Sequence, residues 1–148
     1  MTAPVVSLGE VAEFVNGAAF KQTDWSAHGM KIIRIQNLTD SSKPYNRTTR
    51  EVKDTIRVRR GDLLVSWSAT LGVFTWEDDE DALLNQHIFR VIPDLSKVDK
   101  SYLRYMIESS ISGMERHLHG ATMKHINRGE FLDCPIPLPP LEEQKRIA

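Results

Sequence analysis

The sequence predicts an α+β fold, in which a mixed, mainly antiparallel sheet packs against helices and the chain ends as a long helix begins. Three observations lead to this class. Short β-branched runs bounded by turn residues recur between residues 31 and 92. After Asp99, apolar side chains recur at three- and four-residue steps. A proline-rich segment then leads into Leu141-Glu142-Glu143, whose acidic residues suit the first turn of a helix.

Length and composition are those of one globular domain. The 148 residues can bury a substantial core, and the lone Cys134 excludes an intrachain disulfide or a cysteine zinc cluster. No apolar run approaches the ~20 residues that span a bilayer, and the first residues lack the features of a signal peptide. We therefore expect a cytoplasmic protein with no membrane partner.

Charge is distributed unevenly along the chain. The formal net charge of −1 is unusual for a protein that binds nucleic acid through charge alone. Between Lys43 and Arg60, however, seven basic residues stand against two acidic ones, a local charge of +5, and Glu77 to Asp81 are five consecutive acids. Such segregation allows one basic face and one acidic face, or two solvated loops.

Near the N-terminus the sequence predicts a short helix. Ser7 and Glu10 have the spacing of a capping box, and Asn16-Gly17 would end the helix. Its apolar face would contain Leu8, Val11, Phe14 and Val15. We expect this helix to be structural.

The middle of the chain predicts strands. A loop over residues 40–49 and a turn at Arg60-Gly61-Asp62 separate them, and Pro93 stops the last one. The predicted strands cover residues 31–36, 55–59, 63–66, 72–76 and 86–92. Among them, 63–66 is the most apolar, so we expect it to be the most buried.

Helices are predicted after Asp99. The first has an apolar stripe that we assign to the core, and Gly120 ends it. The stripe contains Leu103, Met106, Ile107, Ile111, Met114 and Leu118. Thr122 would be the N-cap of a second helix. Eight residues from Leu141 are too few for a stable isolated helix, so we interpret the chain as a domain cut from a longer protein.

Several of these motifs resemble one protein family. Residues 135–147, PIPLPPLEEQKRI, are similar to the junction between the target recognition domain and the spacer helix in specificity subunits of type I restriction–modification systems. Gly120-Ala121-Thr122 resembles the family's G-x-T step, and Gly61 to Ser66 resembles its G-D-I-L-I-S strand. Arg34 and Asn37 match an R-x-x-N pattern. Ala69 departs from the family, in which many members have glycine.

The resemblance implies a role in DNA recognition. Residues 1–140 would be a target recognition domain that reads one half of a bipartite DNA site, and residues 141–148 would begin a truncated spacer helix. The domain would be non-catalytic and would direct separate methyltransferase and restriction subunits. Its partners would be double-stranded DNA, those two subunits and, through the spacer helix, a second recognition domain.

Basic and amide side chains in predicted loops are the candidate DNA contacts. Phosphate contacts are assigned to Lys21, Arg47, Arg50, Thr122, Lys124, His125 and Arg128. Base contacts are assigned to Arg34, Gln36, Ser68, Gln86 and His87, because such groups match the edges of bases. Asn37 is instead interpreted as the cap of a turn. Each candidate could equally be an ordinary surface residue.

No catalytic motif is found. His117, His119 and His125 are a dense histidine group, but no carboxylate is spaced to complete a zinc site. Pro93-Asp94 and Glu143-Gln144-Lys145 imitate a Mg²⁺-dependent nuclease motif, yet they lie nearly fifty residues apart. Glycine-rich phosphate loops and methyltransferase motifs do not occur. We therefore expect neither a cofactor nor a metal.

Two alternatives to the specificity subunit stay open at this point. The chain could be the recognition domain of a fused restriction–methyltransferase enzyme, which the neighbouring sequence would distinguish. It could also be an assembly module that does not read DNA. A steep fall of DNA affinity with salt would count against the assembly module.

Overall fold

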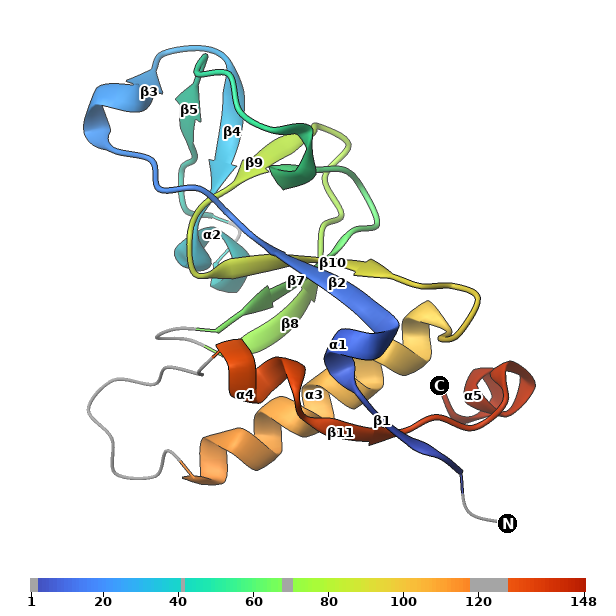
Figure 1. Cartoon of the computed structure of the whole chain (residues 1–148). Coiled ribbons are helices and arrows are strands. Elements are labelled where there is room, and N and C mark those ends of the chain that lie inside the picture. The colour runs from blue at the N-terminus through green and yellow to red at the C-terminus, as the bar shows by residue number, and fades with distance from the viewer. Residues whose placement is uncertain (1–2, 41, 68–70, 118–127) are drawn as a thin grey trace.

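The chain folds as three sheets, with most of its helices packed at one end (Figure 1). The computed structural model describes residues 3–40, 42–67, 71–117 and 128–148. Pairings between the named strands are antiparallel except for one. The predicted α+β class with a mixed, mainly antiparallel sheet is therefore confirmed.

A four-stranded antiparallel sheet lies at the centre. In spatial order its strands are β2 (Ala12–Asn16), β10 (Ile88–Pro93), β7 (Leu63–Ser66) and β8 (Gly72–Thr75). One face packs against α1 (Leu8–Val11), α3 (Lys100–His117) and α4 (Arg128–Leu132). The α3 stripe is part of this core: Leu103, Ile107 and Ile111 are buried, as predicted.

A five-stranded sheet packs on the other face. Its strands, in spatial order, are β3 (Trp25–Ser26), β5 (Asn46–Thr48), β4 (Met30–Ile33), β9 (Ala82–Leu84) and β6 (Arg57–Val58). β4 and β9 form the parallel pair. A second core, which includes Leu64, Ile88 and Trp76, fills the space between the sheets. The short helix α2 (Ile35–Thr39) and the 3₁₀ turns η1 (Gln22–Asp24) and η2 (Asp54–Ile56) connect these strands.

The helix predicted over residues 8–15 is only half correct. The Ser7 backbone N–H donates to the Glu10 carboxylate at 2.9 Å, as the predicted cap requires, but α1 ends at Val11. The following residues form β2, in which buried Phe14 alternates with exposed Glu13. Pairing with β10 along the whole of β2 supplies long-range backbone hydrogen bonds, and these override the local helical spacing.

Four predicted strands are shorter in the structure, and the one at 72–76 loses only Trp76. The strand at 31–36 ends at Ile33, because α2 begins immediately afterwards. The strand at 55–59 is a 3₁₀ turn followed by the two residues of β6. The strand at 86–92 begins only at Ile88, because His87 has a φ of 71°, which breaks the extended backbone. Strand 63–66 has the predicted bounds.

The two ends of the described chain lie side by side. β1 (Val5–Ser7) pairs with β11 (Pro135–Pro137), and α5 (Leu141–Ile147) begins at the predicted position with Pro140 as its N-cap. Gln144 is buried and ties α5 to the start of α3. Its amide donates to the carbonyls of Lys97 and Pro139, and its oxygen accepts from the N–H of Asp99 at 2.8 Å.

Candidate nucleic-acid interface

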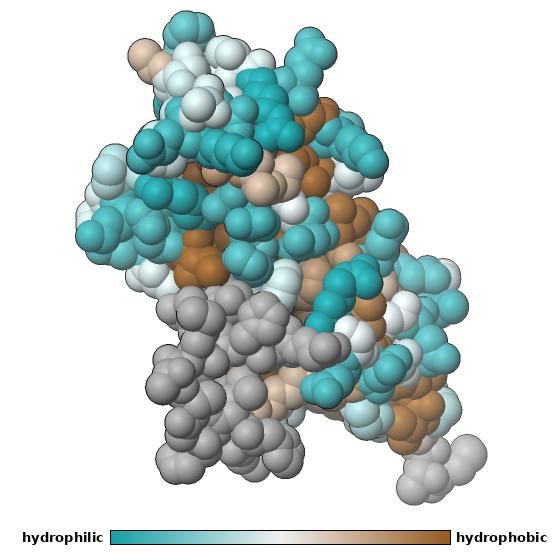
Figure 2. Space-filling model, turned by 60° about the vertical axis from the view of Figure 1, so that its left-hand side comes forward, coloured by the Kyte–Doolittle hydropathy of each residue, from teal (hydrophilic) through white to brown (hydrophobic). Residues whose placement is uncertain are grey.

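One end of the four-stranded sheet collects polar and aromatic groups. β2 and β7 end there and β10 begins there, because β10 runs antiparallel between them. The Trp67 N–H donates to the His87 carbonyl at 3.2 Å and closes this end of the sheet. Figure 2 brings this side of the molecule forward, and its upper part is mainly hydrophilic, with hydrophobic atoms reaching the surface in several places. We call Asn16, Trp67, Gln86 and His87 the sheet-end cluster.

Trp67 is fixed at the middle of this cluster. Its indole Nε1 donates to Asn16 Oδ1 at 3.1 Å. Its ring stacks on Phe89, with a centroid separation of 5.4 Å and an interplanar angle of 19°. The indole and the His87 ring form a T-shaped pair, with ring centroids 5.1 Å apart. Trp67 is half-buried, so its ring is a rigid platform that still reaches the surface.

His87 has an unusual backbone conformation. Its φ of 71° lies in the left-handed region, which is uncommon for residues other than glycine. Neighbouring backbone bonds impose this turn: Asn85 N–H donates to Ile33, and Gly17 N–H donates to Ile88. Such strain concentrates at functional sites. Gln86, in the same turn, is exposed to solvent and can reach a ligand.

Of the predicted base contacts at the strand end, Arg34 directly follows β4 and is the N-cap of α2, whereas Gln36 lies within α2. Gln36 is exposed. The Arg34 guanidinium carbon lies 6.0 Å from the centre of the Trp25 ring. Asn37 is a structural cap, as interpreted from the sequence: its side chain accepts from the Arg34 N–H and donates to the carbonyls of Lys43 and Pro44.

Sequence reasoning missed two buried amides close to Arg34. Among the described residues, Arg34 Nε, Asn46 Nδ2 and Asn85 Oδ1 are buried side-chain atoms without a hydrogen-bond partner. Asn46 pairs with Ile32 on β4, and the Asn85 N–H bonds to the Ile33 carbonyl. All three therefore gather where β4 passes into α2. No local motif identifies them, because their proximity depends on strand register.

The arginines predicted to contact phosphate have partners within the fold. Arg47 donates to the Gly29 carbonyl and to Glu80, and Arg50 donates to the Ala19 carbonyl and to Asp24. Arg128 donates to the Phe14 carbonyl at 3.2 Å and lies 5.8 Å from the Phe89 ring centre. Lys21 is exposed. Ser68, Thr122, Lys124 and His125 lie outside the described residues.

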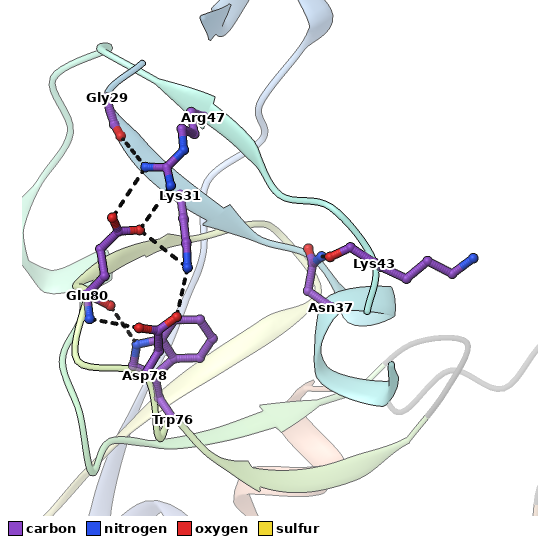
Figure 3. Close-up of polar contacts among 8 residues, drawn as sticks. All are labelled: Gly29, Lys31, Asn37, Lys43, Arg47, Trp76, Asp78 and Glu80. Carbon is purple, nitrogen blue, oxygen red and sulfur yellow. Dashed lines mark hydrogen bonds and ion pairs between the residues drawn. The ribbon is translucent and has the colours of Figure 1, made fainter. Parts of the chain in front are cut away.

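The basic and acidic segments, for which the sequence allowed two separate faces or two solvated loops, pair with each other in the structure. The acids of the loop 78–81 pair with basic residues of the five-stranded sheet and its surroundings, and Figure 3 shows the pairs that Asp78 and Glu80 make. Asp78 pairs with Lys31, Glu80 with Lys31 and Arg47, Asp81 with Arg57, and Asp79 with Arg60. Opposite charges that are distant in sequence attract one another in the folded chain, so the local charges cancel.

Apart from the very close contact of Arg60 with Asp79, the Lys31–Asp78 pair is the shortest ion pair in this network. Lys31 Nζ lies 2.8 Å from the Asp78 carboxylate. This hydrogen bond lowers the pKa of Asp78, with help from the Glu80 backbone N–H, and it raises the pKa of Lys31 above its ordinary value despite partial burial. Both charged forms are therefore stabilised.

Within the described residues, no group of three or more His, Cys, Asp or Glu side chains could hold a metal ion. Of the histidine group considered from the sequence, His119 and His125 fall outside that part of the chain. The described helices include none that is long and apolar enough to cross a membrane.

Comparison with known families matches this chain over residues 2–148 to the type I restriction modification DNA specificity domain. The chain belongs to this family. The specificity domain is 29% identical over 146 residues to the type I restriction enzyme EcoBI specificity subunit of Escherichia coli, covering 97% of this chain and 30% of that protein. It is 28% identical over 159 residues to the MjaVIII specificity subunit of Methanocaldococcus jannaschii, covering 97% of this chain and 37% of that protein.

The fold of the specificity domain also has a solved counterpart. The HsdS subunit from Thermoanaerobacter tengcongensis superposes with a TM-score of 0.71 at 23% identity, covering 97% of this chain and 35% of that one. The specificity domain therefore spans about a third of the length of these relatives.

Proposed function

We propose that this specificity domain reads one half of a bipartite DNA target within a type I specificity subunit. The family match over residues 2–148 carries this proposal. The domain itself is non-catalytic and directs separate methyltransferase and restriction subunits. Double-stranded DNA and these two subunits are its partners, and it needs no cofactor.

In this proposal the sheet-end cluster and α2 face the DNA. Gln36 and Gln86 offer amides suited to adenine, and Arg34 offers a guanidinium suited to guanine. The Trp67 platform and the strained turn at His87 keep this edge of the sheet rigid, so DNA binding costs less conformational entropy there. Position supports this proposal, because α2 and the start of β10 lie on the same side of the fold (Figure 1).

Phosphate contacts would come from few cations. The arginines of the basic segment are paired with carboxylates. Of the other predicted phosphate contacts, Lys21 is exposed, and Thr122, Lys124 and His125 lie outside the described residues. Arg47, Arg50 and Arg128 already donate hydrogen bonds within the fold, so fewer of their N–H groups are available to DNA. We therefore expect modest affinity for arbitrary DNA and a shallow dependence on salt.

The domain division is part of the same proposal. Residues 1–140 form the recognition domain, and residues 141–148 begin a spacer helix through which a second recognition domain would be joined. The buried Gln144 supports this division, because it fixes the direction of α5 relative to the recognition domain.

Selection from a random DNA pool tests the function. The chain should enrich one short half-site, and a competition assay should show tighter binding to that duplex than to one with a changed base pair. Incubation with DNA, Mg²⁺ and a methyl donor should give neither cleavage nor methylation. Enrichment of no sequence would contradict DNA reading, and activity abolished by a point mutation would contradict the non-catalytic role.

A further inference from the structure

Two basic side chains face each other across neighbouring strands. Lys31 of β4 and Arg47 of β5 are paired in register. Like charges at directly opposed positions repel one another, so the pair is unfavourable unless an anion lies between them. The side chains are 17% and 33% exposed, which leaves both cations accessible from one side.

A carboxylate from a distant part of the chain fills that position. Glu80 Oε2 lies 3.5 Å from Lys31 Nζ and 3.4 Å from an Arg47 guanidinium nitrogen (Figure 3). Asp78 occupies the other side of Lys31 at 2.8 Å and accepts the Glu80 N–H. The Trp76 indole donates to the Glu80 carbonyl, so the backbone of this loop is held as well.

The arrangement resembles the way a protein holds a phosphate. An anion with several oxygens lies between a guanidinium and an ammonium, with a backbone fixed behind it. Asp81 and Asp79 extend the pattern to Arg57 and Arg60. Each of the four consecutive acidic residues therefore pairs with a basic side chain. We call residues 78–81 the acidic loop.

We propose that the acidic loop occupies a latent phosphate-binding site of Lys31 and Arg47 and thereby keeps this face of the five-stranded sheet from binding DNA. The proposal rests on the DNA-reading function. An attached carboxylate competes at an effective concentration in the millimolar range or above, whereas a DNA phosphate must come from solution. DNA is then left to bind at the sheet-end cluster, where bases can be read.

The test removes the two carboxylate charges and keeps the side-chain shapes. Asp78→Asn/Glu80→Gln should bind a 20-base-pair duplex of arbitrary sequence roughly ten-fold more tightly than the unaltered chain at low salt. The slope of log affinity against log salt should steepen by about two, because two cations become available. The matched control is Glu13→Gln/Glu77→Gln, which makes the same change in net charge at exposed residues outside the network.

A second variant distinguishes the exposure of Lys31 and Arg47 to DNA, which we call unmasking, from a general effect of net charge or of lower stability. Adding Lys31→Gln and Arg47→Gln to Asp78→Asn/Glu80→Gln should abolish the gain. The proposal is overturned if the gain persists in that four-fold variant, if the control gains equally, or if no gain occurs. If thermal scanning shows that the double variant is unfolded, Glu80→Gln alone is tested. Its affinity for arbitrary DNA should rise roughly three-fold, and the slope of log affinity against log salt should steepen by about one. An affinity equal to that of the unaltered chain overturns the proposal.

The two proposals can fail separately. Unmasking is measured on arbitrary DNA, so it is seen even if selection enriches no half-site. Conversely, a chain that enriches a half-site but shows no unmasking keeps the DNA-reading function and loses only the role of the acidic loop.

Discussion

The indole of Trp67 donates a 3.1 Å hydrogen bond to Asn16 and so fastens the residue after β7 to the last residue of β2. Because β10 lies between these strands, the bond crosses the end of the sheet above Phe89, on which the indole stacks. A side chain held by both a hydrogen bond and a stack has little freedom left to lose. We expect such a residue to contribute geometry more than stability.

Trp67→Phe tests this expectation. The variant loses the bond to Asn16 but keeps an aromatic ring, so the free energy of unfolding should fall by only about 1 kcal/mol. Discrimination between the selected duplex and a mismatched one should fall by more, about ten-fold, because the platform can tilt. Urea denaturation and competition binding measure the two quantities. Discrimination equal to that of the unaltered chain would contradict the platform role. The control is Tyr105→Phe, on the exposed side of α3, which should change neither the free energy of unfolding nor the discrimination.

Substitutions of His87 separate backbone strain from side-chain function. His87→Ala and His87→Gly both remove the ring, but only glycine adopts a φ of 71° without steric cost. The glycine variant should therefore be more stable than the alanine variant by about 1–2 kcal/mol in urea denaturation. Both should lose preference for the selected half-site. An alanine variant as stable as the glycine variant would mean that the turn relaxes, and retained preference would remove His87 from the DNA-reading group.

The neighbours Gln36 and Asn37 should respond in opposite ways. Asn37→Ala removes a buried side chain that bonds the Arg34 N–H and the carbonyls of Lys43 and Pro44, and it should cost about 1–3 kcal/mol of stability. Gln36→Ala removes an exposed side chain and should change stability by less than about 0.5 kcal/mol. On the selected duplex alone, Gln36→Ala should cost ~1–3 kcal/mol of binding. If it weakens matched and mismatched duplexes alike, Gln36 does not read a base.

Gln144→Ala should release α5 from the body of the domain. Three hydrogen bonds join this buried amide to Lys97, Asp99 and Pro139, and their loss should cost about 1–3 kcal/mol. Amide hydrogen exchange in α5 should accelerate while exchange in β7 and β10 is much less affected. Lys145→Ala, at the exposed neighbour, is the control. Unchanged protection of α5 in Gln144→Ala would show that the helix is held by other contacts.

Stability should fall in acid partly through Asp78. Lys31 and the Glu80 N–H lower its pKa in the folded chain, so the charged form contributes stability above about pH 4, its ordinary range, and the contribution is lost as pH falls through the lower folded pKa. Asp78→Asn should be less stable at neutral pH and show a flatter dependence below about pH 4. Thermal scans across that window measure both. Parallel curves would contradict a role for Asp78 in acid sensitivity.

How much the sequence predicts depends on how local each feature is. The α3 stripe, the Leu63–Ser66 strand and the start of α5 were predictable because periodicity or a cap specifies them within a few residues. β2 was mistaken for helix because its pairing with β10, more than seventy residues away, decides its conformation. The candidate site follows the same rule. Residue type alone identified His87 and Gln86 as candidates. Asn16 and Trp67 join them only through the order of strands in the sheet. The partners of Arg47 and Arg50 likewise depend on contacts between residues that are distant in sequence.

The parallel pairing of β4 with β9 also constrains how the chain folds. β9 lies between β4 and β6, and its register joins Lys31 to Ala82 across about fifty residues. Closing so long a loop is entropically costly and typically slows folding to milliseconds or longer. During synthesis, β4 and β6 have no strand between them until residue 84 has left the ribosome. We expect nascent chains that end before β9 to remain protease-sensitive in pulse-proteolysis experiments, and protection to appear in a single late step.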